Sequence, residues 1–447
     1  MAVSDWSGGS LPWVEDLAAV KERIGALFGR AEPRRQVGLL LEGLIGGVER
    51  KNGWQLAEYA GDAAPWRMQA LLGRTLWDQE KARDICRDFV IERLGDPSGV
   101  LILDETGFVK KGSHSVGVAR QYSGTAGRVE TCQIGVFLSY AGPKGHALID
   151  RRLDLPKDWA EDPERRAGAS VPDDVRFATK PKIGAAMVEA ALQAGVPCAW
   201  VLGDSVYGSD KSLRVMLERR EKPYVLCVRG NERLMAGDFH THTAEELAAG
   251  LSPGQWRRLP AGEGSKGPRL YDWARLRLLR LQAPPWDHWL LIRRSTSDPT
   301  DLAFYVTFGP HLTELHELAA VAGLRWTIEE CFQSAKGETG LDHCEARSWH
   351  GWHRHMTLSM IALAFLAGLR ARLKETQITV ASDKANKRGV YRRPHDPHRN
   401  SRGHQRPGIA AAHHPSPNRS PARHGLSLGV VSLATPTSGQ GKTSPLP

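Results

Sequence analysis

Two segments of the chain repeat one order of residues: an apolar run, an aspartate and a glycine turn. In SGVLILDETG the run from Val100 ends on Asp104, and in AWVLGDSVYG a similar run ends on Asp204. Short apolar runs bounded by turn residues are typical of buried β-strands. Both aspartates are therefore expected at the C-terminal ends of strands, which restricts the chain to folds with a central sheet.

The stretch between the two aspartates predicts how their strands are connected. VARQYSG, ETCQIGVFLSYAG and HALIDRRLDLP have the composition of strands in a meander, and residues 183–194 have the spacing of a helix. A second helix over 213–220 and the strand YVLCV follow. Crossovers between parallel strands of one sheet are right-handed. We therefore predict a mixed α/β sheet in which the strands ending on Asp104 and Asp204 are adjacent and parallel.

Residues 12–95, which precede this sheet, have helical periodicity. Within them, WQLAEYAGDAAPWRMQALLGR predicts two short helices joined at Gly61, with Trp54, Trp66 and several basic residues around the turn. Such a pair is either a helix-turn-helix that reads DNA or an ordinary helical hairpin, and the residues leave both interpretations open.

The segment that follows the sheet interrupts it and then returns to helix. Residues 231–310 contain alternating, strand-like stretches separated by Gly and Pro clusters, which predict a small inserted β subdomain. Residues 311–345 are helical in pattern. Residues 352–373 form a largely apolar helix that we expect to pack on the sheet.

The net charge of +10 is concentrated at one end of the chain. Residues 376–447 contain eleven Lys or Arg and two Asp or Glu, a balance of +9, so the first 375 residues carry only +1. The same segment holds nine of the 27 prolines and a single aromatic residue, which predicts a basic, disordered tail. Any nucleic acid bound by the body must therefore be bound by local patches.

Cysteine spacing and hydropathy exclude several classes of protein. The six cysteines form no CxxC pair, which argues against a zinc ribbon and against a secreted disulfide framework. The N-terminus has no basic region followed by an apolar run, as a secretory signal would. The longest apolar stretch, residues 358–369, is too short to span a bilayer. We therefore expect a cytoplasmic protein with no membrane partner.

The paired aspartates have a structural and a chemical interpretation. Either one could cap a helix or order a turn. As neighbours without a basic residue between them, however, Asp104 and Asp204 would repel each other unless a cation lay between them. Hard divalent ions such as Mg²⁺ take oxygen ligands, and ligands of open α/β sheets gather at this edge. The pair therefore predicts a magnesium site.

A third acid is expected from the segment LRWTIEECFQSAKG. At about 100° per residue, Arg325, Glu329 and Lys336 fall within about 40° of one another, along the border of the apolar face. Glu330 falls on the opposite side, toward solvent. Glu329 is therefore the better metal ligand, although an i,i+4 pair with Arg325 would also explain it. The apolar face consists of Ile328, Phe332 and Ala335.

These segments resemble one known family. LDETGF, LGDSVYG and RWTIEECFQSAKGETGLDH, together with ERKNGWQLAEYAGD, are similar to segments of the DDE transposases of bacterial insertion sequences. One branch of that family has a Tyr-x2-Arg-x3-Glu-x6-Lys pattern around its third acid. Arg325, Glu329 and Lys336 match its last three positions, whereas Ala322 stands at the tyrosine position. The resemblance covers approximately residues 49–370.

The resemblance implies an RNase H-like catalytic domain and a mechanism. Asp104, Asp204 and Glu329 would hold two Mg²⁺ ions, or Mn²⁺, and Arg325 and Lys336 would bind phosphates beside the cleaved bond. The DNA partners would be the terminal inverted repeats and the target, bound by a homodimer on paired ends at the bacterial nucleoid. The implied regions are a helical DNA-binding domain (1–97), the catalytic domain in two parts (98–230 and 311–375), the inserted β subdomain (231–310) and the tail (376–447).

Two further groups of residues are considered because of their chemistry. In similar transposases an aromatic residue of the insertion stabilises an unstacked base during hairpin formation, and Trp256, Trp273, Trp286 and Trp289 are the residues that could do so here. Core packing is the expected role of most of them. His350, His353 and His355 have no zinc spacing and are expected to pack or to contact phosphate.

Two alternatives to an active transposase remain. The first is a catalytically silent DNA-binding derivative, which the alanine at position 322 and the unusual tail, either native or a frameshifted end, would suit. The second is a metal-dependent DNA nuclease that acts outside transposition. Inverted repeats flanking the gene would distinguish this second possibility from a transposase.

Overall fold

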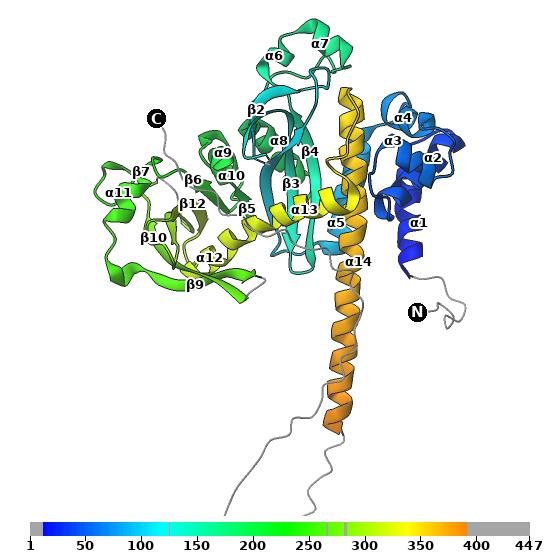
Figure 1. Cartoon of the computed structure of the whole chain (residues 1–447). Coiled ribbons are helices and arrows are strands. Elements are labelled where there is room, and N and C mark those ends of the chain that lie inside the picture. The colour runs from blue at the N-terminus through cyan, green and yellow to red at the C-terminus, as the bar shows by residue number, and fades with distance from the viewer. Residues whose placement is uncertain (1–11, 125, 265–266, 281–283, 391–447) are drawn as a thin grey trace, which may run out of the picture. The chain divides into compact units, whose positions relative to one another are not determined.

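Five helices begin the described part of the chain, as the helical periodicity predicts. The computed structural model describes residues 12–124, 126–264, 267–280 and 284–390, with the side chains of 378–390 left out (Figure 1). The Asn52 side chain accepts hydrogen bonds from two backbone N–H groups at the start of the third helix, and Gly61, at φ +75°, turns the chain toward the fourth. The helices are α1 (Pro12–Gly25), α2 (Ala31–Ile45), α3 (Gly53–Tyr59), α4 (Trp66–Gly73) and α5 (Gln79–Leu94).

The described strands are arranged mainly in one ten-stranded sheet. The first four strands are β1 (Val100–Val109), β2 (Ala119–Ser123), β3 (Arg128–Gly142) and β4 (Gly145–Asp154); the next two are β5 (Trp200–Gly203) and β6 (Tyr224–Val228). β3 is long enough to pair with β1, β2 and β4. β1 pairs in parallel with β5, and β5 pairs in parallel with β6. This confirms the predicted mixed sheet and the adjacent, parallel strands that lead to the two aspartates.

The strands of the insertion extend this sheet. β12 (Leu302–Pro310) pairs with β6, and β11 (Trp286–Arg294), β10 (Gly267–Arg277) and β9 (Arg257–Gly264) follow in order. A small second sheet contains β7 (Arg233–Met235) and β8 (Thr241–Thr243), followed by α11 (Ala244–Ala249) and the short helix η1 (Pro253–Gln255). Because β12 pairs along the edge of β6, the insertion is continuous with the central sheet. Its buried Trp273, Trp289 and Tyr305 also form a second hydrophobic cluster with α12 (Leu315–Gly323).

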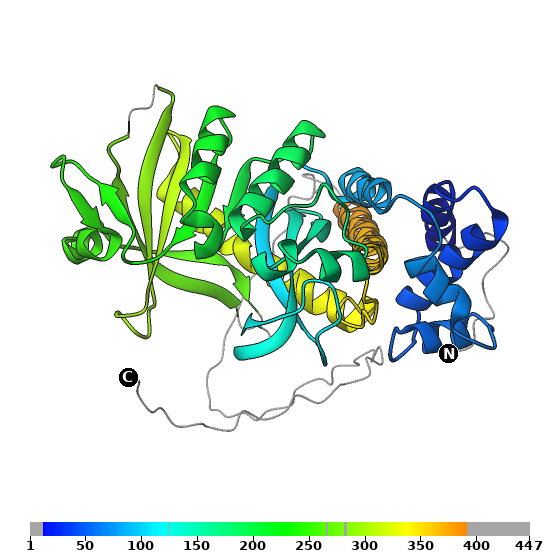
Figure 2. The ribbon, with the colours of Figure 1, turned by 90° about the horizontal axis from the view of Figure 1, so that it is seen from above.

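Helices cover both faces of the sheet. α8 (Lys180–Gln193) packs on β3 and β4, whereas α13 (Thr327–Thr339) packs on β1, β3 and β4 from the other side (Figure 2). The remaining short helices are α6 (Lys157–Ala160), α7 (Pro163–Gly168), α9 (Ser205–Gly208), α10 (Lys211–Arg219), α12 (Leu315–Gly323) and η2 (Leu324–Trp326). Successive side chains of β1 therefore point toward different helices.

The last helix, α14 (Trp349–Val390), supplies much of the core. Trp352 is fully buried and its ring lies 6.4 Å from that of Phe137 on β3, as expected for an apolar helix packed on the sheet. The segment Trp349–Gln377 is long and apolar enough to cross a membrane, but 67% of its apolar window is buried inside the protein, as in a core helix. α14 continues beyond residue 375, the predicted start of the tail, and residues 391–447 of that tail lie outside the described residues.

Candidate active site

The two aspartates follow the last paired residues of adjacent parallel strands. The β1–β5 pairing ends at Leu103 and Gly203, so Asp104 and Asp204 come next on each side. The glycine turn predicted after Asp104 is wrong, because β3 remains paired with β1 as far as Val109. Of the two strands that pair with β1, only β5 stops pairing just before Asp104, and the end of that pairing opens a cleft there.

Asp204 has the capping role that its structural interpretation predicts. Its Oδ1 accepts hydrogen bonds from the backbone N–H of Val206 at 2.9 Å and of Tyr207 at 3.4 Å, at the start of α9. Capping through one oxygen leaves the second carboxylate oxygen available to the cleft. The two interpretations of this residue are thus compatible.

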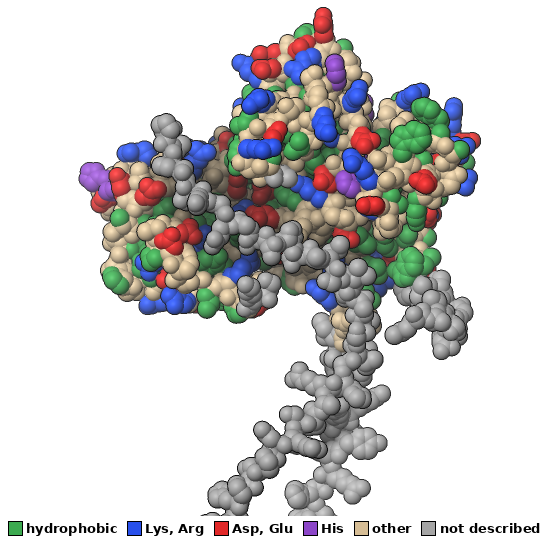
Figure 3. Space-filling model, viewed as in Figure 1, with side chains coloured by type: hydrophobic (Ala, Val, Ile, Leu, Met, Phe, Trp, Pro, Cys, Tyr) green, Lys and Arg blue, Asp and Glu red, His purple; other side chains and the backbone are tan. Residues whose placement is uncertain are grey.

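The three predicted acids line the same cleft. Its volume is about 740 Å³, and its walls include Asp104, Asp204, Glu329 and Lys336. Figure 3 shows acidic side chains gathered in the hollow between the part of the sheet with β1–β4 and the part with β9–β12. The structure therefore brings together residues that are far apart in the sequence.

α13 presents its two glutamates as the helical spacing predicts. Ile328 and Ala335 are fully buried, and Glu329 lies at the border of this buried face. The Glu330 side chain is 62% exposed and lies 3.9 Å from His146, away from the cleft. The geometry of the helix thus places only one of the two acids at the site.

Arg325, expected at a phosphate, contacts carboxylates in this structure. Its Nη1 lies 3.4 Å from Asp104 Oδ2, and its Nη2 lies 3.2 Å from Glu329 Oε1. In the part of the chain that is described, no three His, Cys, Asp or Glu side chains converge closely enough to hold a metal ion. The guanidinium that bridges Asp104 and Glu329 occupies the position of a counterion to both.

The electrostatics of the aspartates nevertheless fit a divalent cation. Burial, and then the charge of Asp204, raise the pKa of Asp104 to about 7, although Arg325 acts in the opposite direction. Burial, and then the charge of Glu105, raise the pKa of Asp204. Two buried carboxylates with too little positive charge between them, and with oxygen donors only, form a set that hard divalent ions favour.

Lys336 lies on the same wall of the cleft as Glu329. Its Nζ donates a hydrogen bond to Thr106 Oγ1 at 2.8 Å, and burial lowers the pKa of the lysine. The stripe of Arg325, Glu329 and Lys336 that the sequence predicts is therefore directed at β1.

Three residues of this region had no role assigned from the sequence. Glu105 lines the cleft and accepts hydrogen bonds from Lys180 Nζ and from the Tyr207 hydroxyl, each at 2.7 Å. Tyr207 is fully buried. The LDET and DSVYG segments contain two of these residues, but the pairing with Lys180 joins positions that only the folded chain brings together.

Ala322, at the tyrosine position of the family pattern, lies beside a second cavity. This cavity has a volume of about 290 Å³, and its lining includes Asp204, Arg325 and Tyr305. Burial raises the pKa of the Tyr305 hydroxyl to about 12. A tyrosine side chain from β12 is therefore present in the cavity that borders Ala322.

Of the four tryptophans considered in the insertion, one lines this cavity. Trp273 is 1% exposed and is among the lining residues. Trp289 is buried, Trp286 stacks on Phe308, and Arg294 lies over the ring of Trp256. Packing explains these last three.

The histidines at the start of α14 are packing residues. His353 Nδ1 contacts the carbonyl oxygen of Trp349 at 2.9 Å, and His355 Nε2 contacts that of Gly340 at 2.9 Å. Both rings are buried, and burial lowers the pKa of each. His350 lies 3.3 Å from the Gln79 amide.

Comparison with known proteins identifies the class. The sequence model of the DDE superfamily endonucleases matches residues 24–274, more than half of the chain, and the protein belongs to this family. The match includes Asp104 and Asp204 and ends before α13. Endonucleases of this superfamily generally use divalent metal ions.

The chain is also similar to a protein with a more specific description. The chain is 28% identical over 195 residues to the probable transposase for insertion sequence element IS701 of Microchaete diplosiphon. The similar region covers 42% of this chain and 47% of that protein, so the chain spans about half the length of the relative it matches.

Proposed function

We propose that this protein is a DNA transposase, which cleaves the ends of an insertion sequence and joins them to target DNA by phosphoryl transfer. One observation carries the proposal: Asp104 and Asp204, which directly follow the parallel pairing of β1 and β5, share a cleft with Glu329. Membership of the DDE endonuclease family and the similarity to the IS701 transposase support it.

Asp104, Asp204 and Glu329 are the residues that would hold two Mg²⁺ ions, or Mn²⁺. When bound, such ions activate the attacking oxygen and stabilise the leaving one. Glu329 contacts Arg325 through Oε1, and its second carboxylate oxygen is available to act as the third ligand.

The protein's own cations position the DNA strand. Arg325 can exchange its two carboxylate contacts for a bidentate contact with a phosphate, because both ligands suit the planar guanidinium. Lys336 lies on the other side of Glu329, and its ammonium is directed to Thr106 beside Asp104. Together they would hold the phosphates on either side of the bond that is cleaved.

The helical N-terminal region is the part of the protein that we assign to sequence recognition. Trp54 and Trp66 are 61% and 67% exposed on α3 and α4, and Arg67 is exposed beside them. Exposed aromatic and basic side chains on a helical pair suit contacts with base edges and phosphates. The DNA partners are the terminal inverted repeats and the target, bound by a homodimer on paired ends at the bacterial nucleoid.

Incubation with the DNA that flanks the gene, in Mg²⁺, tests this function. We expect cleavage at the two inverted repeats, mapped at nucleotide level, followed by joining to a target plasmid. Asp204→Asn should bind the same DNA without cleaving it. Cleavage of unrelated DNA without joining would identify a nuclease outside transposition, and binding without cleavage by the wild-type protein would identify a silent derivative.

A further inference from the structure

Three consecutive residues of β1 each hold a cationic side chain from a different element. The pairs are Asp104–Arg325 at 3.4 Å, Glu105–Lys180 at 2.7 Å and Thr106–Lys336 at 2.8 Å. The first and third cations belong to the stripe already described on η2 and α13. The second, Lys180, comes from the start of α8 and has no role so far.

Lys180 reaches the site from the opposite face of the sheet. α8 and α13 cover different faces (Figure 2), and successive residues of a strand point to opposite faces. Lys180 and Lys336 nevertheless line the same cleft, because the parallel pairing of β1 ends there. The two lysines therefore lie on either side of the acids, where a DNA strand with its cleaved bond at the acids would place its flanking phosphates.

The Lys180 ammonium is held in a way that permits exchange. Its side chain is 26% exposed, and that of its partner Glu105 is 18% exposed. Glu105 Oε2 also accepts a hydrogen bond from the buried Tyr207 hydroxyl. If Lys180 moves to another anion, the Glu105 carboxylate still accepts the hydrogen bond from Tyr207. This remaining hydrogen bond limits the free-energy cost of separating Lys180 from the half-buried Glu105.

The surrounding charges favour a cation at this position. Glu105 and Asp154 both face Lys180, and burial raises the pKa of Asp154 to about 6 while Lys180 acts in the opposite direction. The cleft as a whole is lined by four carboxylates and two lysines; the carboxylates are those of Asp104, Glu105, Asp204 and Glu329. Divalent cations at the aspartates would reduce the negative charge that holds Lys180.

We propose that Lys180 is a third phosphate-binding residue of the active site, held by Glu105 in the free protein and transferred to a phosphate of the cleaved strand when DNA binds. The proposal rests on the proposed function, since it places the cleaved bond at Asp104 and Asp204. It adds a contact on the α8 side of the cleft, opposite Lys336.

Methylphosphonates, which are uncharged analogues of DNA phosphates, distinguish direct phosphate binding by Lys180 from a structural role of this residue. Cleavage rates are measured on the flanking DNA with one methylphosphonate at a time on each side of the cleavage site, for the wild-type protein and for Lys180→Met. We expect Lys180→Met to slow cleavage of ordinary DNA about 10- to 100-fold, the worth of one charge-assisted hydrogen bond. At one position the methylphosphonate should slow the wild-type protein equally and have no further effect on Lys180→Met.

Two variants serve as controls. Lys182→Met removes an exposed lysine from the same turn of α8 and should match the wild-type protein at every methylphosphonate position. Glu105→Gln keeps Lys180 and an acceptor for Tyr207, so it should retain the wild-type pattern of methylphosphonate penalties. The double variant Glu105→Gln/Lys180→Met removes the unpaired acid, and it should show the same loss at the same phosphate even if Lys180→Met alone is unstable.

Two results would overturn the assignment of Lys180. One is an unchanged pattern of methylphosphonate penalties in both variants that lack Lys180. The other is the disappearance of the same methylphosphonate penalty in Glu105→Gln, which keeps Lys180. The variant Asp204→Asn distinguishes a wrong role for Lys180 from a wrong proposed function. If Asp204→Asn is inactive while the methylphosphonate pattern is unchanged, only the role of Lys180 is wrong; if Asp204→Asn cleaves normally, the active site itself is misplaced.

Discussion

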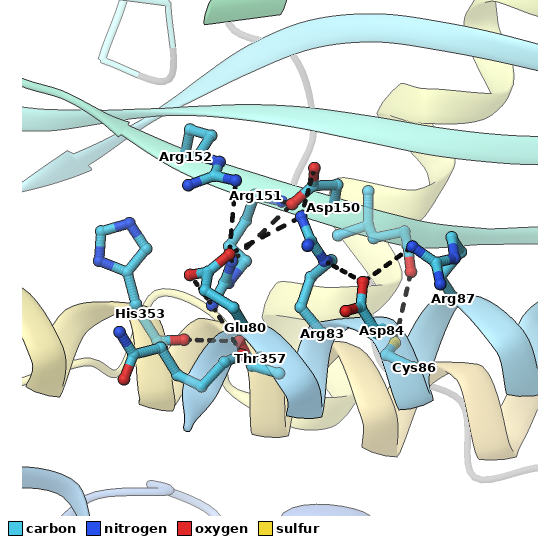
Figure 4. A network of polar contacts seen from close by, with 12 residues as sticks. Glu80, Arg83, Asp84, Cys86, Arg87, Asp150, Arg151, Arg152, His353 and Thr357 are labelled. Carbon is cyan, nitrogen blue, oxygen red and sulfur yellow. Dashed lines mark hydrogen bonds and ion pairs between the residues drawn. The ribbon is translucent and has the colours of Figure 1, made fainter. Parts of the chain in front are cut away.

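Two clusters of buried charges lie on the same sheet and differ in their balance. The first is the cleft with Asp104 and Asp204. The second, the α5–β4 network, joins α5 and β4 beside the start of α14 (Figure 4). Its members are Glu80, Arg83, Asp84, Arg87, Asp150, Arg151 and Arg152, with His353 beside them.

In the network, each acidic side chain forms ion pairs with more than one arginine. Arg151, which is fully buried, lies 3.1 Å from Glu80 Oε1 and donates a second hydrogen bond to the Gln79 carbonyl oxygen. Arg152 also contacts Glu80. Burial alone would raise the pKa of Glu80, but Arg151 and Arg152 lower it to about 2.

In the cleft, burial likewise raises the pKa of the carboxyl groups, but too few cationic side chains are present to lower it again. Burial, and then the charge of Asp204, raise the pKa of Asp104 to about 7, although Arg325 and the backbone N–H of Glu105 act in the opposite direction. The network therefore pairs each acid with arginines and links α5 to β4, whereas the cleft retains an excess of negative charge. That excess is what a site for divalent cations requires.

Loss of a cleft carboxylate is expected to have the largest effect on activity. Asp104→Ala, Asp204→Ala or Glu329→Ala should lower Mg²⁺-dependent cleavage by about three orders of magnitude or more and leave DNA binding largely intact, because each removes a proposed metal ligand. Glu330→Ala, on the exposed side of α13, should retain activity. End-labelled cleavage and gel-shift assays measure the two properties, and an inactive Glu330→Ala with an active Glu329→Ala would contradict the assignment.

Loss of a network arginine should affect stability instead. Arg151→Met leaves the buried Asp150 and the half-buried Glu80 with fewer partners and should lower the free energy of unfolding by about 3–5 kcal/mol. Arg152→Met is the matched control: its side chain is 40% exposed, and the expected loss is below about 1 kcal/mol. Urea denaturation measures both values. Equal losses in the two variants would show that burial does not distinguish the neighbouring arginines.

The pH dependence of the free energy of unfolding should reveal the excess negative charge at Asp104. The pKa of Asp104 is raised from 3.8 to about 7 in the folded protein, so the protonated form is favoured by folding. The protonated Asp104 therefore contributes fully to stability below about pH 4, and this contribution is lost as the pH rises through about 7.

Asp104→Asn removes this titration and keeps the shape of the side chain. Without metal, the variant should therefore gain stability relative to the wild-type protein, by about 2–4 kcal/mol between about pH 5 and about pH 8. Mg²⁺ at the higher pH should stabilise the wild-type protein and leave the variant unchanged. Denaturant unfolding across this pH range measures the difference, and a constant difference would mean that Asp104 is already ionised at low pH.

Local patterns predicted much of the site. The apolar runs before Asp104 and Asp204 were sufficient to place two parallel strands, because strand ends and turn residues are local signals. The spacing of Ile328 and Ala335 was sufficient to choose Glu329 over Glu330, because helical periodicity fixes which side chains lie on the apolar face.

Contacts between distant residues were not predictable in this way. β1 continues past Asp104 because of its pairing with β3, and the insertion joins the sheet because β12 pairs with β6. Which neighbour satisfies a strand edge depends on the whole topology. Likewise, HALIDRRLDLP indicates a strand, but only the packing of α5 against β4 shows that Arg151 is fully buried.

The smallest expected effect tests whether the Lys336 ammonium belongs to the cleft or only packs there. Because it lies beside the acids and contacts Thr106, Lys336→Gln should slow cleavage about tenfold and weaken DNA binding much less. Lys144→Gln, at a 43% exposed lysine paired with Glu375, should change neither. Cleavage rates at saturating DNA and dissociation constants measured on the same duplex provide the comparison. Equal losses in rate and affinity would mean that Lys336 binds the duplex as a whole, and the cation beside the cleaved bond would then have to be sought on another element.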